Sequence, residues 1–167
     1  MSHRRTRLAG RHAEGTLDEL IHDLPCDVLV LDERGFGPSE VLLPTTGGYS
    51  SDRSAEVAQA LRETVGANVS VLHVADDPTA GREFLDEWVA DHGLDGADRL
   101  VRTGDVETAI GDAATGWMLV VVGATERGVF SRIVGGSLTL SVLDDLDTTV
   151  LLAERPHARS VRERLFG

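Results

Sequence analysis

Short apolar runs alternate along this chain with segments whose apolar residues recur every three or four positions. From residue 40 onward the apolar runs are rich in β-branched residues, which is typical of strands in a parallel sheet covered on both faces. The predicted strands are residues 40–46, 68–74, 98–104, 117–123 and 148–154. The predicted helices are residues 50–66, 79–93, 105–116 and 137–146. Five strands with intervening helices predict an α/β fold with a doubly wound parallel sheet.

Capping and terminating residues delimit the predicted helices. Ser50 or Ser51 is expected to cap the first helix, and Asp105 the third, because short polar side chains accept hydrogen bonds from the first N–H groups of a helix. Gly66 and Gly93 follow the first two helices and suit the left-handed conformation that ends them. The residues expected to face inward are Ala55, Ala58, Leu61, Val65, Phe84, Leu85, Trp88, Val89, Val106, Ala109, Ile110 and Ala113.

The segment in front of residue 40 contains an internal repeat. The stretch "DLPCDVLVLDE" (23–33) matches "DLDTTVLLAER" (145–155) in pattern, and residues 16–24 before it read as a helix with Thr16 and Glu19 in a capping box. We interpret residues 16–38 as a helix–strand remnant of a preceding repeat; the alternative is an unrelated N-terminal appendage of similar composition. The predicted organisation is a flexible tail (1–15), this remnant, an α/β domain (39–155) and a C-terminal tail (156–167).

Among the bulk properties of the sequence, net charge says most about the expected origin and partners of the protein. The net charge is −12, and all 16 basic residues are arginine, since the sequence has no lysine. A surface so rich in carboxylates is typical of proteins from a salt-loving archaeon, the alternative being an acidic protein of unusual composition. It argues against a nucleic-acid partner, which requires a basic face. The arginines near the N-terminus, at positions 4, 5, 7 and 11, fall in the predicted tail.

Most catalytic and metal-binding patterns are missing from the sequence. Without lysine there is no Walker motif, and "GGSLT" (135–139) lacks the second glycine of a nucleophile elbow. The single cysteine, Cys26, and the six histidines show no metal-ligand spacing, and His73 is expected to be a strand residue with a hydrogen-bond partner. We therefore expect no catalytic or metal-binding residues.

The expected location is cytoplasmic. The basic N-terminus is followed by no apolar segment of the kind that a secretory signal has. The longest apolar runs have six or seven residues, too few to cross a membrane, so no direct membrane insertion is expected.

Four motifs in a fixed order carry a family resemblance. They are "LLPTTGG" (42–48), "VLHV" (71–74), "RTGDVETAI" (102–110) and the glycine-rich "GATERGVFSRIVGGS" (123–137). Over residues 40–154 the chain resembles the universal stress protein family, whose fold is an α/β sheet of the adenine-nucleotide alpha-hydrolase type. The stretch "GATERG" also resembles the cytosolic universal-stress domains of haloarchaeal amino-acid transporters.

The resemblance implies a nucleotide site between the first and fourth strands of the domain. Nucleotide-binding members of the family place ATP there. Gly123, Gly136 and Ser137 match the family's phosphate loop. Pro44, Thr45, Thr46 and Val74 match positions on the adenosine side.

Two departures from the family pattern change what is expected of the site. Thr46 stands where the family has aspartate, and Glu126 stands at a loop glycine, where its charge opposes a triphosphate. Gly128 is expected to restore the turn, and Arg127 to supply positive charge. We therefore expect ATP binding to be weak or lost, with AMP the better ligand.

The function expected from these features is that of a regulatory or sensing module acting by binding. The alternatives are an ATP- or AMP-binding protein with slow hydrolysis, and a domain working with an amino-acid transporter or another protein partner. A homodimer is expected through the apolar edge strand 148–154, because open edges invite pairing. The alternative is that "CDVLVLD" (26–32) covers this edge within the same chain.

Overall fold

The computed structural model describes residues 28–32, 35, 37–116, 119–123 and 148–154, which belong to one compact unit, Val28–Arg155. The predicted helices 16–24 and 137–146, both tails and most of the glycine-rich loop lie outside the described residues. Within the described part, no helix has the length and apolar character needed to cross a membrane.

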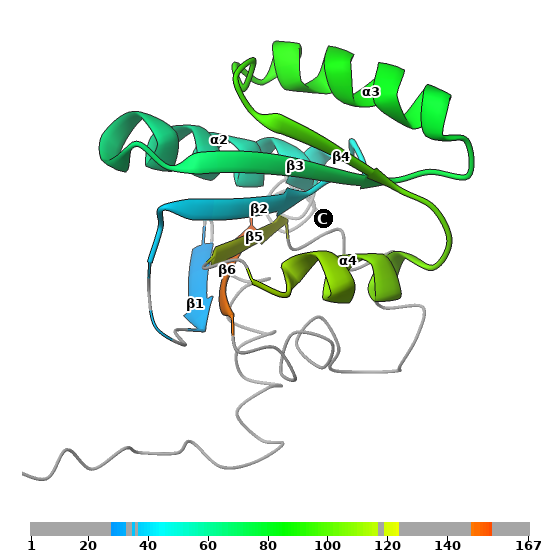
Figure 1. The fold of residues 1–167 in the computed structure, drawn as a ribbon. Helices are drawn as coiled ribbons and strands as arrows, with labels where there is room; N and C mark the ends of the chain where they lie inside the picture. Colours follow the sequence, from blue (N-terminus) through cyan, green and yellow to red (C-terminus); the bar gives the residue numbers. More distant parts are fainter. Residues whose placement is uncertain (1–27, 33–34, 36, 117–118, 124–147, 155–167) are drawn as a thin grey trace, which may run out of the picture. The chain divides into compact units, whose positions relative to one another are not determined.

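The described unit is built on one six-stranded sheet (Figure 1). Its strands are β1 (Val28–Asp32), β2 (Glu40–Pro44), β3 (Asn68–Val74), β4 (Asp98–Arg102), β5 (Leu119–Gly123) and β6 (Thr149–Glu154). The spatial order is β1-β6-β5-β2-β3-β4. Strands β2 to β6 are parallel, whereas β1 runs antiparallel to β6. The predicted five-stranded parallel sheet is therefore confirmed, with β1 added at one edge.

Helices cover both faces of the sheet (Figure 1). Helices α2 (Tyr49–Val65) and α3 (Pro78–Asp91) pack on one face, and α4 (Val106–Ala114) packs on the other. Successive side chains of a strand point to opposite faces. Accordingly Val41 and Leu43 of β2 belong to the core under α2 and α3, whereas Leu42 belongs to the core under α4, and all three are fully buried.

Helix ends agree with the sequence predictions at some positions and differ at others. Asp105 caps α4 as predicted, and Gly66 ends α2 with a φ of 71°. The predicted serine cap is wrong: α2 begins at Tyr49 after Gly48, so Ser50 and Ser51 lie inside its first turn. The prediction that Val65 faces inward is also wrong, because its side chain is 53% exposed. A helix of 17 residues is about 25 Å long, which is longer than a five-residue strand. The last turn of α2, which contains Val65, therefore extends beyond the strand.

Candidate functional site

The order of the strands reverses between β2 and β5. From β2 the chain proceeds through β3 to β4 on one side, whereas β5 and β6 lie on the other side. The two central strands pair in parallel at Val41–Leu119 and Leu42–Val120. In open α/β sheets, ligands bind at such a reversal, beyond the carboxyl ends of the strands. The structure thus has a topological switch point next to the end of β2.

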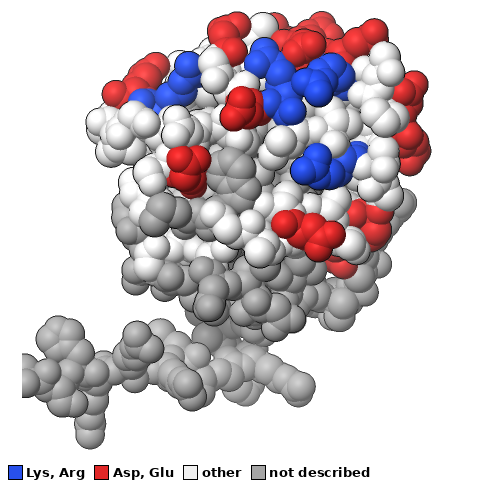
Figure 2. All heavy atoms as spheres, viewed as in Figure 1, with Lys and Arg blue, Asp and Glu red and all other residues white. Residues whose placement is uncertain are grey.

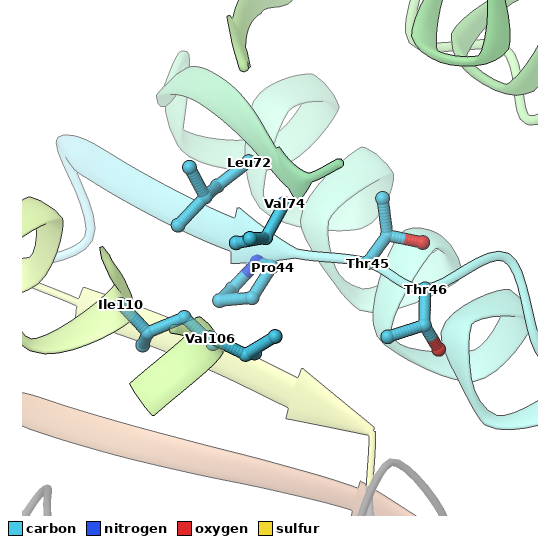
Figure 3. A pocket seen from close by; sticks show the side chains of 7 residues that line it. All are labelled: Pro44, Thr45, Thr46, Leu72, Val74, Val106 and Ile110. Carbon is cyan, nitrogen blue, oxygen red and sulfur yellow. The ribbon is translucent and has the colours of Figure 1, made fainter. Parts of the chain in front are cut away.

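A hollow lies at the carboxyl ends of β2 and β3, beside α4 (Figure 3). The space between its walls amounts to about 320 Å³, including the part open to solvent. The volume enclosed by the walls is much smaller, about 30 Å³, so the hollow is a shallow depression that is mostly open to solvent. The residues that line the hollow are Pro44, Thr45, Thr46, Leu72, Val74, Val106 and Ile110.

Three separate elements supply the walls of the hollow. Leu72 and Val74 lie two residues apart on β3 and so share the face that α4 covers. Val106 and Ile110 lie one helical turn apart on α4, which places them on one side of that helix. Figure 3 shows these aliphatic side chains around Pro44, with the hydroxyl groups of the two threonines at one end. The walls are therefore apolar, and polar groups lie at one end.

Hydrogen bonds hold the loop that follows β2. The N–H of Thr45 donates to the carbonyl oxygen of Leu72 at 2.8 Å, and the N–H of Gly47 donates to Thr45 Oγ1 at 3.1 Å. His73 Nδ1 lies 2.9 Å from the carbonyl oxygen of Thr45. Because a carbonyl only accepts, Nδ1 carries the proton. The expected hydrogen-bond partner of His73 is thus confirmed, and its role is to tie β3 to this loop.

Helix α3 supports the same loop from the opposite face of the sheet. Gly47 has a φ of 79°, and a Cβ atom added there would lie 2.8 Å from two ring carbons of Phe84. The ring of Phe84 in turn lies 4.3 Å from the ring of His73, centroid to centroid. A glycine is therefore needed at position 47 both for its backbone conformation and for the close approach of the ring. This packing positions Thr45 and Thr46 at the end of the hollow.

The structure brings together four of the residues predicted from the sequence: Pro44, Thr45, Thr46 and Val74 all line the hollow. Gly123 is buried at the end of β5. The remaining predicted residues, Arg127, Gly128, Gly136 and Ser137, lie outside the described residues, as does Glu126.

Three residues that line the hollow were not predicted as site residues: Leu72, Val106 and Ile110. Leu72 shares a strand face with Val74, so the alternation of β3 was a usable signal. Val106 and Ile110 were assigned only to a core-facing side of their helix, because periodicity alone cannot distinguish a wall of a pocket from packed core.

The described walls of the hollow carry aliphatic side chains and two hydroxyl groups, which suit a flat, uncharged ring system. At position 46 the side chain is threonine, so the carboxylate expected from the family pattern is replaced by a hydroxyl. In the described part of the chain, no group of three or more His, Cys, Asp or Glu residues is arranged to hold a metal ion.

Asp105 fixes the start of α4 and with it one wall of the hollow. Its Oδ1 accepts hydrogen bonds from the N–H and the hydroxyl of Thr108, both at 2.9 Å. The backbone hydrogen bond from Thr108, followed by its side-chain bond, holds the pKa of the Asp105 carboxyl below its usual value. A carboxyl whose pKa is lowered by folding stabilises the folded state above its unfolded pKa, and this contribution is lost as the pH falls through the folded value.

Asp105→Ala is therefore expected to lower the melting temperature at neutral pH and to flatten its decline below about pH 4. Thermal unfolding measured between pH 7 and pH 3 in molar KCl checks this. Asp112→Ala is the matched control, since Asp112 is an exposed aspartate on the same helix. Equal losses in the two variants at neutral pH would show that the cap does not hold α4.

Comparisons with known proteins place this fold. No family model matches the chain, and no curated protein matches it. Among solved structures, a protein from the universal stress protein family of Burkholderia pseudomallei aligns with a TM-score of 0.48 and 22% identity, covering 69% of this chain and 95% of its own. A universal stress protein from Archaeoglobus fulgidus aligns with a TM-score of 0.63 and 22% identity, covering 86% of this chain.

The chain therefore has the α/β fold of universal stress proteins. It spans 54% of the Archaeoglobus chain, about half of its length. The alignment to that chain covers 86% of this chain, whereas residues 40–167 make up less than four fifths of it. The aligned part therefore also includes residues in front of β2. The finer resemblance to transporter-associated domains stays a prediction.

Proposed function

We propose that this protein is a regulatory or sensing module that acts by binding a small ligand in the hollow beside β2, β3 and α4. The observation that carries the proposal is the position of this apolar hollow at the carboxyl ends of β2 and β3, next to the switch point between β2 and β5, where α/β folds bind their ligands. Four residues selected from the sequence converge on it.

The ligand proposed is an adenine nucleotide, with AMP preferred over ATP. The aliphatic walls suit the base, and the backbone N–H groups of the glycine-rich sequence after β5 suit a phosphate. Glu126 adds a negative charge within that sequence. Repulsion between like charges grows with the number of phosphates, so affinity should fall from AMP to ATP. The cytoplasm is the proposed location.

Titration calorimetry in molar KCl with AMP, ADP and Mg-ATP tests the order of affinities. We expect AMP to bind at least tenfold more tightly than ATP, and Glu126→Gly to raise the affinity for ATP by a similar factor, about 1.4 kcal/mol. ATP binding to the unmodified protein that is as tight as AMP binding contradicts the proposed order. An unchanged ATP affinity in Glu126→Gly shows that the carboxylate is not the obstacle.

A substitution inside the hollow tests where the ligand binds. Val106→Trp places an indole among the aliphatic walls and is expected to weaken AMP binding at least tenfold, because the added ring occupies the space of the base. Asp112→Trp adds the same side chain to an exposed position of α4 and should leave the affinity unchanged. If Val106→Trp binds AMP as the unmodified protein does, the hollow is not the site.

Two alternative functions give different results in the same preparations. An ATP-binding protein with slow hydrolysis would release phosphate from Mg-ATP over hours, and Val106→Trp would stop that release. A regulatory domain that works with an amino-acid transporter through protein contacts alone would show no heat of binding with any of the three nucleotides.

A further inference from the structure

Strand β1 meets β6 in a register that has the symmetry of a contact between two identical strands. The five pairs run from Val28–Glu154 through Val30–Leu152 to Asp32–Val150. The two matching sequence stretches equate Val28 with Val150 and Asp32 with Glu154. When each residue is replaced by its equivalent, the first pair, Val28–Glu154, becomes the last pair, Val150–Asp32. The central pair, Val30–Leu152, becomes itself. The antiparallel ladder thus has a local pseudo-twofold axis at Val30–Leu152.

The residue types on the two strands agree position by position. The sequence of β1 is VLVLD, and the equivalent residues of β6 are VLLAE. The first two positions are identical, the next two are aliphatic in both strands, and the last is acidic in both. A contact between two identical strands about a twofold axis is what an isologous homodimer uses. At the positions paired with β6, strand β1 therefore has nearly the residue types that the β6 of a second copy would have there.

The connection from β1 to β2 is short enough to keep this contact within one chain. Asp32 pairs with Val150, at the amino end of β6, and β2 begins at Glu40 at the same end of the sheet. Strands β1 and β2 are three places apart in the sheet, a distance of about 14 Å. The seven residues from 33 to 39 can span about 25 Å.

From these observations we propose that β1 is an intramolecular substitute for the β6 of a second copy of this chain. A short tether gives β1 an effective concentration in the millimolar range, so at micromolar protein it outcompetes a second copy by roughly a thousandfold. When β1 is displaced, β6 becomes an open and self-complementary edge. Two copies then pair through β6 with Leu152 opposite Leu152 and Val150 opposite Glu154. The partner of this surface is thus the same chain.

The test uses the full chain in molar KCl, with Cys26→Ser in every variant so that only introduced thiols react. Leu29→Pro combined with Val30→Pro displaces β1, because N–H groups of successive strand residues alternate in direction and one of the two prolines must remove a donor to β6. We expect light scattering to show a monomer for the unmodified chain and a dimer for the double-proline variant.

Cysteine cross-linking tests the register. In the double-proline background, Leu152→Cys is expected to give a covalent dimer on oxidation, since the proposed axis places residue 152 opposite itself. Val150→Cys is the matched control: it lies opposite Glu154, about 13 Å from its own copy, and should stay uncross-linked. With native β1, Val30→Cys combined with Leu152→Cys should form a disulfide within one chain.

Each contrary result overturns the proposal. A double-proline variant that keeps its circular dichroism and stays monomeric shows that β6 does not take a second copy. A dimer that cross-links equally at 150 and 152 has another register, and an unmodified chain that dimerises through residue 152 is not closed by β1. If the double-proline variant does not fold, Leu29→Gly with Val30→Gly keeps the N–H groups but weakens β1. Its dimer fraction must then exceed that of the unmodified chain.

Discussion

Replacing Gly47 by alanine is expected to lower the free energy of unfolding by about 2–4 kcal/mol, one of the largest single-residue effects in this protein. A left-handed backbone costs a residue with a Cβ atom about 1–2 kcal/mol. The remainder comes from the ring of Phe84, which lies 2.8 Å from where the new Cβ atom would be. Because Gly47 follows Thr46 at the end of the hollow, ligand affinity should fall as well. Denaturant unfolding and calorimetry in molar KCl measure the two effects.

Gly66→Ala is the matched control for this prediction. Gly66 has a similar φ of 71°, but a Cβ atom there would meet nothing within 4 Å. It should therefore show the backbone cost alone and leave ligand affinity unchanged. Adding Phe84→Leu to Gly47→Ala should recover part of the loss by removing the clash. Equal destabilisation by the two glycine substitutions would mean that the ring of Phe84 does not constrain the loop.

The second large effect expected is a rise in melting temperature of about 10 °C or more between 0.05 M and 2 M KCl. The net charge is −12, and Figure 2 shows acidic side chains spread over this view of the molecule with arginines between them. On α3 alone, Glu83, Asp86, Glu87 and Asp91 are exposed. The Debye length falls from about 30 Å at 0.01 M salt to about 3 Å at 1 M, so salt screens their repulsion.

A charge-neutralising variant separates screening from other effects of salt. Glu83→Gln combined with Glu87→Gln removes two exposed negative charges from α3 and should reduce the rise in melting temperature, mainly by stabilising the protein at low salt. Melting followed by circular dichroism across the salt series gives the comparison. The repulsion argument is wrong if the unmodified protein melts at the same temperature from low to high salt.

Local patterns predicted the elements that depend on neighbouring residues. Strand β3 was predicted with the bounds Asn68–Val74 that the structure has, because a segment rich in β-branched residues follows a helix terminator at Gly66. The cap at Asp105 was predicted because a capping aspartate bonds to N–H groups only two or three residues away. The serine cap of α2 failed for the same local reason: Ser50, Ser51 and Gly48 all suit a helix start.

The site residues that lie at the ends of strands were predictable from the sequence. Pro44 ends β2, Thr45 and Thr46 follow it directly, and Val74 ends β3, the neighbouring strand. Val106 and Ile110 come from an element more than 60 residues further along the chain than Pro44. Their apolar spacing predicts a buried helix face, and whether that face packs tightly or leaves a hollow depends on the volume of side chains across it.

The sheet edge formed by β1 and β6 separates most clearly what the sequence determined from what the tertiary structure decided. The likeness between residues 23–33 and 145–155 was visible in the sequence, and so was the apolar character of both strands. That β1 lies on β6, antiparallel and centred on Val30 and Leu152, was open, since covering by β1 and pairing with a second copy both satisfied the pattern. Periodicity reports on contacts a few residues apart. The position of β1 depends on hydrogen bonds between residues about 120 positions apart, whose formation rests on the tether length and on which edge the rest of the fold leaves open.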